Sequence, residues 1–300
     1  MGRPFILIAI DLGLFLRHKH SMSTRLTLCM DCQDEPGLIA RVTGVLHRHG
    51  GNIVENGEYV DPETNQFFMR TAVEGIEDGD LLLRVLKTEL PEQASVKLQD
   101  LTNKKVMLMA TKEPHCLGDL LIRASFGDLP MEVCGVIANH ENLRELTESF
   151  KVPFYFCDHR ECSREEHEAK VIAIIDEHQP DLVVMAKYMR IVSSEFILHY
   201  PNRIVNIHHS FLPAFIGANP YRQAWERGVK IIGATAHFAS EVLDEGPIIA
   251  QDVTPVSHHH NPKEMARNGR DVEKRVLARA IRLVLEDRVV VTGNKTVLFE

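Results

Sequence analysis

Apolar and polar positions alternate along residues 25–98 in short blocks that predict four strands and two helices. The strands are expected over residues 25–31, 52–60, 66–73 and 94–98, and the helices from about 37 to 49 and from 78 to 90. Gly50 and Gly51 follow the first helix, where glycine commonly ends a helix, and residues 61–65 have the composition of a hairpin loop. The order βαββαβ is that of a ferredoxin-like domain.

A different pattern begins after a short polar link at residues 103–105. Near-continuous apolar runs alternate with amphipathic segments, which is typical of a parallel sheet covered by helices on both faces. The chain is therefore predicted to be α/β, with a ferredoxin-like domain before a mostly parallel, Rossmann-like domain. The expected strands are residues 106–110, 132–138, 154–157, 182–185, 204–207, 230–238 and 248–255, the last a candidate for antiparallel pairing. The expected helices are residues 115–125, 142–150, 164–178 and 263–286.

Composition narrows the class of protein. The 300 residues are 44% hydrophobic and 25% charged, with a formal charge of -8 and no dense block of lysine and arginine, so a nucleic-acid partner is disfavoured. Six cysteines are too few for a disulfide scaffold, and Cys29-x-x-Cys32 lacks the second pair or helix start that a zinc or redox site needs. The run His258-His259-His260 has no carboxylate or cysteine at ligand spacing, so no metal site is expected.

The first 22 residues fit neither domain. The apolar run from Phe5 to Leu16 is interrupted by Asp11, is too short to span a bilayer and is followed by no small-residue cleavage site. The simplest interpretation is an N-terminal extension over residues 1–22, with Met22 as the natural start. We therefore expect no membrane partner and a cytoplasmic protein.

Three side chains in the second half have the chemistry needed to act on a small carbonyl group. Asn206 can hold the carbonyl oxygen, His208 can move a proton, and Asp244 can orient an attacking atom. Asn206 and His208 lie on one side of an expected strand, at the carboxyl end where ligands bind in parallel sheets. Asn-x-His alone is more often a strand cap and a buried histidine. The longer pattern reverses that balance, because it continues through Ser210-x-Leu212-Pro213, His237 and Leu243-Asp244-x-Gly246-Pro247.

This string of motifs resembles the formyltransferase family that works on 10-formyltetrahydrofolate, and the resemblance covers essentially residues 25–300. It implies that Asn206 holds the formyl oxygen, that His208 acts as acid and base, and that Asp244 positions the nucleophile. It also implies a folate-binding segment over residues 185–192, where the pterin lies against an apolar wall. The binding residues implied are Met189, Arg190, Ile191, Val192, Gly217 and His237. Because the folate is the substrate in this family, no cofactor is expected.

The N-terminal block carries a second resemblance. The segment Asp34-Glu35-Pro36-Gly37-Leu38 and the Gly-Gly-Asn-Ile turn that follows the first helix are similar to those of the ACT family of regulatory modules. The chain then divides into an extension (1–22), an ACT-like domain (23–102) and a catalytic domain (103–300). The resemblance implies amino-acid effectors at subunit interfaces, and the open sheet edges of such a domain favour a homo-oligomer.

Differences within the formyltransferase family indicate which acceptor is used. Members that act on a phosphorylated amine have a glycine-rich loop after the first catalytic strand, whose backbone amides hold the phosphate. Here residues 110–117 contain no glycine, and Glu113 would repel an anion. Members that act on tRNA are expected to carry a further C-terminal domain, whereas the extra domain here is N-terminal. The resemblance is therefore to the formyltetrahydrofolate deformylases, which use water. The expected reaction is hydrolysis of 10-formyltetrahydrofolate to formate and tetrahydrofolate, in one-carbon and purine metabolism.

Two other interpretations remain open. Ile216 and Asn219 stand where the deformylase pattern usually has lysines, and the loss of those point charges would weaken the grip on the acidic folate tail. A catalytically inactive regulator that binds folate or an amino acid is consistent with that loss. The other interpretation is transfer of the formyl group to an amine acceptor, although the sequence shows no nucleotide-sugar site.

Overall fold

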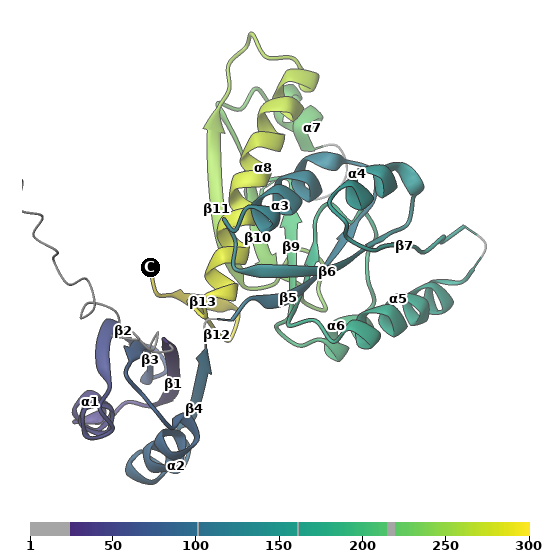
Figure 1. The fold of residues 1–300 in the computed structure, drawn as a ribbon. Helices are drawn as coiled ribbons and strands as arrows, with labels where there is room; N and C mark the ends of the chain where they lie inside the picture. The colour runs from purple at the N-terminus through teal and green to yellow at the C-terminus, as the bar shows by residue number, and fades with distance from the viewer. Residues whose placement is uncertain (1–24, 101, 161, 215–219) are drawn as a thin grey trace, which may run out of the picture.

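The computed structural model describes residues 25–100, 102–160, 162–214 and 220–300, which form two sheets and a short C-terminal hairpin (Figure 1). The extension expected over residues 1–22, including Met22, lies outside the described residues. So do Gly217, Ile216 and Asn219.

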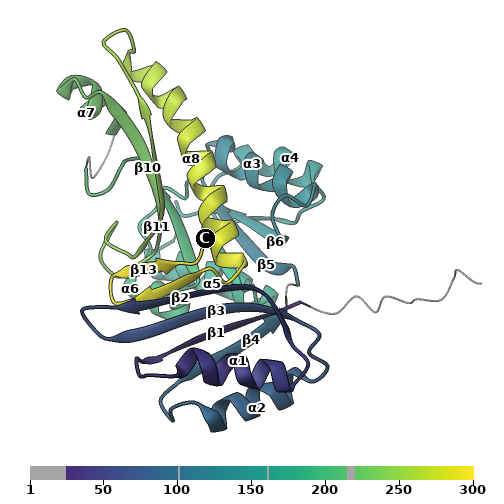
Figure 2. The same cartoon turned by 90° about the vertical axis from the view of Figure 1, so that its left-hand side faces the viewer.

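The first sheet is four-stranded and antiparallel, in the order β2-β3-β1-β4. Both of its helices lie on one face of this sheet (Figure 2). The core between them contains Leu28, Val42, Leu46 and Leu82, all fully buried, which is the packing that the amphipathic pattern predicts. The predicted βαββαβ order is confirmed. Its elements are β1 (Leu26–Gln33), α1 (Leu38–Arg48), β2 (Asn52–Asp61), β3 (Gln66–Glu74), α2 (Gly79–Glu89) and β4 (Ser95–Asp100).

The second sheet has seven strands in the order β11-β10-β9-β8-β5-β6-β7. The five strands from β9 to β7 in this order run parallel to one another, whereas β10 is antiparallel to both β9 and β11. The mostly parallel sheet is confirmed, and the strand that runs against the others is β10. The strands are β5 (Lys104–Ala110), β6 (Met131–Ala138), β7 (Phe154–Phe156), β8 (Leu182–Met185), β9 (Ile204–His208), β10 (Ile231–Phe238) and β11 (Ile248–Pro255).

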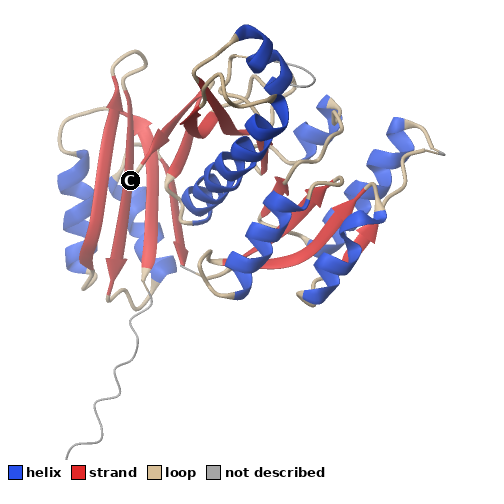
Figure 3. Cartoon of the chain, turned by 90° about the horizontal axis from the view of Figure 1, so that it is seen from above, coloured by secondary structure: helices blue, strands red, loops and turns tan. Residues whose placement is uncertain are grey.

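Helices cover both faces of the seven-stranded sheet (Figure 3). One face packs against α3 and α8 through residues such as Leu117, Leu120 and Leu277. The other packs against α5 and α6 through Val171 and Phe196. The helices are α3 (Pro114–Ser125), η1 (Glu141–Leu143), α4 (Arg144–Ser149), α5 (Arg164–His178), α6 (Ser194–His199), α7 (Pro220–Arg227) and α8 (Pro262–Leu285).

Some element boundaries differ from the sequence prediction. Strand β5 begins at Lys104, inside the predicted polar link, because ladder hydrogen bonds are made by the backbone and tolerate lysine side chains at a strand end. Helices α6 and α7 were not predicted, since one or two turns are too short to show a helical period. The C-terminal hairpin of β12 (Val289–Thr292) and β13 (Lys295–Leu298) was also missed.

The C-terminal hairpin and the residues before it join the two sheets. Arg288 forms an ion pair with Glu55 on β2 at 2.7 Å, and Thr296 donates a hydrogen bond to the carbonyl of Ile248 on β11 at 2.6 Å. Arg70 on β3 donates from Nη2 to the carbonyl oxygen of Glu286 at 2.9 Å and from Nη1 to Glu55 at 3.0 Å. Its guanidinium is almost fully buried, so this cluster fixes the four-stranded sheet on the end of α8.

Replacing Arg70 by methionine should lower the free energy of unfolding by about 3 kcal/mol, because two carbonyls and a carboxylate lose their buried partner. Denaturant unfolding measures this change. Arg84→Met, at an exposed arginine on α2, is the matched control and should stay within about 0.5 kcal/mol of the unmodified protein. Equal stabilities of the two variants would contradict the proposed joining role.

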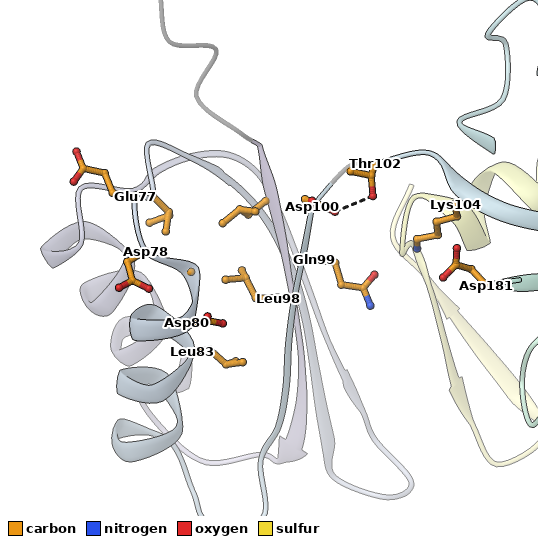
Figure 4. A pocket seen from close by; sticks show the side chains of 13 residues that line it. Glu77, Asp78, Asp80, Leu83, Leu98, Gln99, Asp100, Thr102, Lys104 and Asp181 are labelled. Atoms are coloured by element: carbon orange, nitrogen blue, oxygen red, sulfur yellow. Dashed lines mark hydrogen bonds between the residues drawn. The ribbon is translucent and has the colours of Figure 1, made fainter. Parts of the chain in front are cut away.

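An open hollow of about 890 Å³ lies between the two domains (Figure 4). Leu83 and Leu98 line the part contributed by the four-stranded domain, and Lys104 and Asp181 line the part contributed by the seven-stranded domain. Its other charged lining residues are carboxylates: Glu77, Asp78, Asp80 and Asp100. The hollow is thus open, acidic and shared by both domains.

All six cysteines are free thiols. Burial, with a smaller contribution from Asp287, raises the pKa of Cys29 to about 11, and Cys32 is buried in the core of the small domain. These are properties of structural cysteines and not of reactive thiolates. Among the described helices, none combines the length and the apolar composition that a membrane crossing requires.

Candidate active site

Asn206 and His208 come from β9 and point to the same side of it, because side chains alternate along a strand. His237 on the neighbouring β10 stands opposite Asn206 in the antiparallel register. Nδ1 of His237 lies 2.8 Å from the carbonyl oxygen of Phe238, so Nδ1 carries the proton and Nε2 is an acceptor. Nε2 lies 3.2 Å from the amide nitrogen of Asn206. His237 therefore orients the Asn206 amide.

His237 is only 2% exposed. Burial lowers its pKa, and this effect outweighs the opposing hydrogen bond to Phe238 and the nearby charge of Asp244. A neutral ring is the form that can accept from Asn206. Its direct contact with folate, implied by the family resemblance, stays a prediction.

The loop between β10 and β11 brings Asp244 to the site. Asp244 has φ +60°, a conformation in which aspartate is more common than most residues. Two residues later the chain passes so close to β10 that a Cβ at Gly246 would lie 1.8 Å from the carbonyl oxygen of Phe238. Phe238 in turn donates its backbone N–H to Pro247 at 2.9 Å. The Asp-x-Gly-Pro spacing is thus required by the close approach of this loop to the strand end.

His208 and Asp244 form a buried pair. Nδ1 of His208 lies 3.1 Å from Oδ1 of Asp244. Burial alone would raise the pKa of Asp244. The hydrogen bond with His208 and the nearby His208 and His237 rings lower this pKa by more, so it lies below its ordinary value. The other ring nitrogen of His208, Nε2, is buried and has no hydrogen-bond partner among the described residues. One nitrogen is held by the carboxylate and the other is left for a reacting group.

The loop after β9 is fixed by side chains of the next two strands. Thr235 on β10 donates to the carbonyl of Ser210 at 2.9 Å and accepts from the N–H of Leu212 at 3.0 Å. Gln251 on β11 donates to the carbonyl of Leu212 at 3.1 Å. The Ser-x-Leu-Pro motif, in which the Leu212–Pro213 peptide is cis, therefore has a structural role in holding the loop beside His208.

The predicted folate segment follows β8 at the same edge of the sheet, since Met185 pairs with Asn206. Met189 and Ile191 are 59% and 61% exposed, an arrangement that leaves apolar surface for a flat ligand. Arg190 and Val192 line a small cavity of about 10 Å³ beneath this segment. Gly217, the other predicted binding residue, lies outside the described residues.

Two family models match this chain: the formyl transferase model over residues 104–281 and the ACT domain model over residues 27–90. A formyltetrahydrofolate deformylase of Haemophilus influenzae is 52% identical over 271 residues, which cover 90% of this chain and 98% of that protein. The crystal structure of a formyltetrahydrofolate deformylase from Pseudomonas syringae pv. tomato has a TM-score of 0.89 and 41% identity, and covers 94% of this chain and 96% of that one. The chain belongs to the formyltetrahydrofolate deformylase family. The resemblance found in the sequence is confirmed.

The deformylase fold also extends to transferases. Glycinamide ribonucleotide transformylase 1 from Symbiobacterium toebii is similar to this chain with a TM-score of 0.64 and 32% identity, and covers 66% of this chain and 95% of that one. The fold is therefore shared by proteins named for different reactions, so the fold alone does not determine the formyl acceptor.

Next to the candidate active site lies a buried ionic cluster that the sequence analysis missed. Glu273 on α8 is 1% exposed. Its carboxylate lies 2.7 Å from Nε2 of His115 and 3.3 Å from Nζ of Lys187, and it accepts a hydrogen bond from the hydroxyl of Tyr221 at 2.5 Å. A signal for Glu273 exists in the sequence, because it stands between buried apolar positions of the α8 stripe.

Part of this cluster has metal-ligand chemistry, since ligand atoms of His115, Cys116 and Glu273 lie within 4.8 Å of one another. The surroundings oppose a cation there. The Lys187 ammonium already contacts the carboxylate, and burial, with the Glu273 charge, raises the pKa of Cys116 well above its ordinary value. A zinc ligand would have to be the thiolate. That the family site uses no metal stays a prediction.

The pKa of Glu273 makes a testable contribution to stability. Burial raises this pKa, but the His115 hydrogen bond, the Lys187 charge and the Tyr221 hydrogen bond together lower it by more. The net pKa falls from 4.5 to about 2. A depressed carboxyl pKa stabilises the fold above the unfolded value, and this stabilisation is lost as pH falls toward the folded value. We expect the stability advantage over Glu273→Gln to shrink by about 3 kcal/mol between pH 5 and pH 2. Denaturant unfolding at both pH values tests this. A constant difference would contradict it.

Proposed function

We propose that this chain hydrolyses 10-formyltetrahydrofolate to formate and tetrahydrofolate at the Asn206–His208–Asp244 site. One observation carries the proposal: Nδ1 of His208 lies on a buried carboxylate, and its buried Nε2 has no partner in the described part of the chain. A general base held in this way can exchange a proton with a small reactant. The Haemophilus influenzae relative, 52% identical, is named for deformylation of formyltetrahydrofolate.

The proposed reaction follows from these positions. Nε2 of His208 takes a proton from water as the water oxygen adds to the formyl carbon. The Asn206 amide, held by His237, donates its second N–H to the formyl oxygen, which becomes negative. The imidazolium, stabilised by Asp244, then gives its proton to N10 of the folate, and the bond between N10 and the formyl carbon breaks. Formate and tetrahydrofolate leave, and no cofactor is consumed.

The test is to incubate the enzyme with 10-formyltetrahydrofolate and no added acceptor, and to measure both products. Formate and tetrahydrofolate should appear in equal amounts over many turnovers. Bound folate without formate release would contradict hydrolysis, and would favour an amine-dependent transferase or an inactive binding protein.

We further propose that the ACT domain binds an amino-acid effector and that the chain forms a homo-oligomer. β2 and β4 are the edges of the small sheet, and an unpaired edge can join a second copy. The hollow beside β4 (Figure 4) is lined by carboxylates of both domains, which would attract the ammonium group of an amino acid. Size-exclusion with light scattering tests the oligomer, and a clean monomer would contradict it.

We also propose that the protein is located in the cytoplasm. Its free thiols are consistent with that reducing compartment.

A further inference from the structure

The ionic cluster of Glu273, Lys187, Tyr221 and His115 takes no part in the reaction above, yet it adjoins the reacting group. The His209 ring stacks on the His208 ring with centroids 5.1 Å apart and planes at 24°. The His209 ring also lies 6.3 Å from the Tyr221 ring of the cluster. His209 thus contacts both the catalytic histidine and the cluster.

Forming this cluster is unfavourable in free energy for two reasons, the burial of charge and the backbone conformation of Lys187. Lys187 and Glu273 are both almost completely buried, and removing two charges from water costs several kcal/mol for each ion before their attraction is counted. Lys187 also has φ +64°, which is unfavourable for a residue with a Cβ. Tyr221 packs so closely on α8 that a Cβ at Gly269 would lie 2.1 Å from its hydroxyl oxygen. The cluster therefore takes one side chain each from α3, the segment after β8, α7 and α8, and these side chains pack together in the interior.

The cluster lies at the edge of the sheet that also carries the reacting groups. Lys187 follows β8, and His209 follows the adjacent β9, so both stand at the carboxyl edge of the sheet with the reacting groups. Burial, with the charges of Lys187 and His208, lowers the pKa of His209 to about 4. At neutral pH His209 is therefore an uncharged spacer and not a second general acid.

We propose that the side chains of Lys187, Tyr221 and Glu273, with His209, close the flank of His208 and so exclude amines as formyl acceptors, leaving water. This inference rests on the proposed hydrolysis. The shared fold of the transformylase requires that some such local feature select the acceptor. With the flank opened, an amine nitrogen would add to the formyl carbon and lose its proton to Nε2 of His208. Cleavage from N10, protonated by the imidazolium, would give an N-formyl amine and tetrahydrofolate.

The test compares two double variants with the unmodified enzyme, using methoxyamine as the amine. Lys187→Gly with Glu273→Gln opens the flank without leaving a buried unpaired carboxylate, and glycine is favoured at this positive φ. Lys187→Met with Glu273→Gln is the matched control, because it removes the same charges and keeps most of the volume. We expect the ratio of N-formyl methoxyamine to formate to rise about tenfold in the glycine variant and to stay low in the methionine variant.

Each outcome has a distinct meaning. Equal ratios in all three proteins, with formate still released, would overturn the acceptor role of the cluster and leave the hydrolysis standing. Absence of formate from the unmodified enzyme would be a failure of the proposed function itself. If the glycine variant does not fold, Tyr221→Ala is compared with Tyr221→Phe. A higher amine ratio in the alanine variant alone supports the inference, and equal ratios overturn it.

Discussion

Replacing His208 by alanine should lower the rate of formate release about 10³-fold, because no other described group can move the proton from water to N10. His237 is the nearest alternative, but its Nε2 is occupied by Asn206 and its Nδ1 by a backbone carbonyl. The His209 ring stacks on the His208 ring and also lies beside Tyr221 of the ionic cluster. Acceptor-free turnover of 10-formyltetrahydrofolate measures the loss.

The control for this change is His47→Ala, at an exposed histidine on α1 of the small domain. It should leave turnover within about twofold of the unmodified enzyme, since surface substitutions rarely act at a distance. A His208→Ala enzyme that keeps even a tenth of the activity would show that the proton moves by another route.

Asp244→Asn should lower turnover by about 10²-fold or more while the fold is retained. Asparagine tolerates the left-handed backbone at this position, so the loop can keep its path. The amide, however, cannot stabilise the imidazolium, and its NH₂ group can turn toward Nδ1 and place the ring proton on Nε2. The histidine would then begin the reaction without a basic nitrogen facing water.

The same assay with Asp271→Asn, at an exposed carboxylate on α8, controls for the change of charge and should show normal turnover. Thermal unfolding of Asp244→Asn should shift by no more than a few degrees. Normal turnover in Asp244→Asn would contradict the assigned role, whereas a large loss of stability would mean that Asp244 mainly holds the loop.

The sequence was sufficient for the parts of the fold that local patterns determine. Alternation and apolar runs located both sheets. The motif residues Asn206, His208 and Asp244 do lie together, because His208 contacts Asp244 directly and Asn206 contacts His237, which lies beside Asp244. The hydrogen bond between His237 and Asn206 was not predicted, because it depends on the pairing of β9 with β10. Pairing partners are not visible in a single strand.

The ionic cluster shows a second kind of limit. The sequence places Lys187 only within the predicted folate-binding segment, and it indicates no role for Tyr221 or His115. The four residues are separated by up to 158 positions, and they meet only because α3, α7 and α8 pack beside the carboxyl ends of β8 and β9. Glu273 alone had a local signal, as a charge within the apolar stripe of α8. A buried charge in a helix indicates a partner but does not identify it.

The most direct test of the central claim is a single-turnover measurement with enzyme in excess over 10-formyltetrahydrofolate, comparing the unmodified protein with Asn206→Ala. This separates the bond-breaking step from folate binding and product release. We predict that Asn206→Ala binds the folate with an affinity within a few-fold of normal but breaks the formyl bond about 10²-fold more slowly, since the amide acts on the developing negative oxygen. Bond breaking at the normal rate in Asn206→Ala would contradict the assignment of this site as the place of hydrolysis.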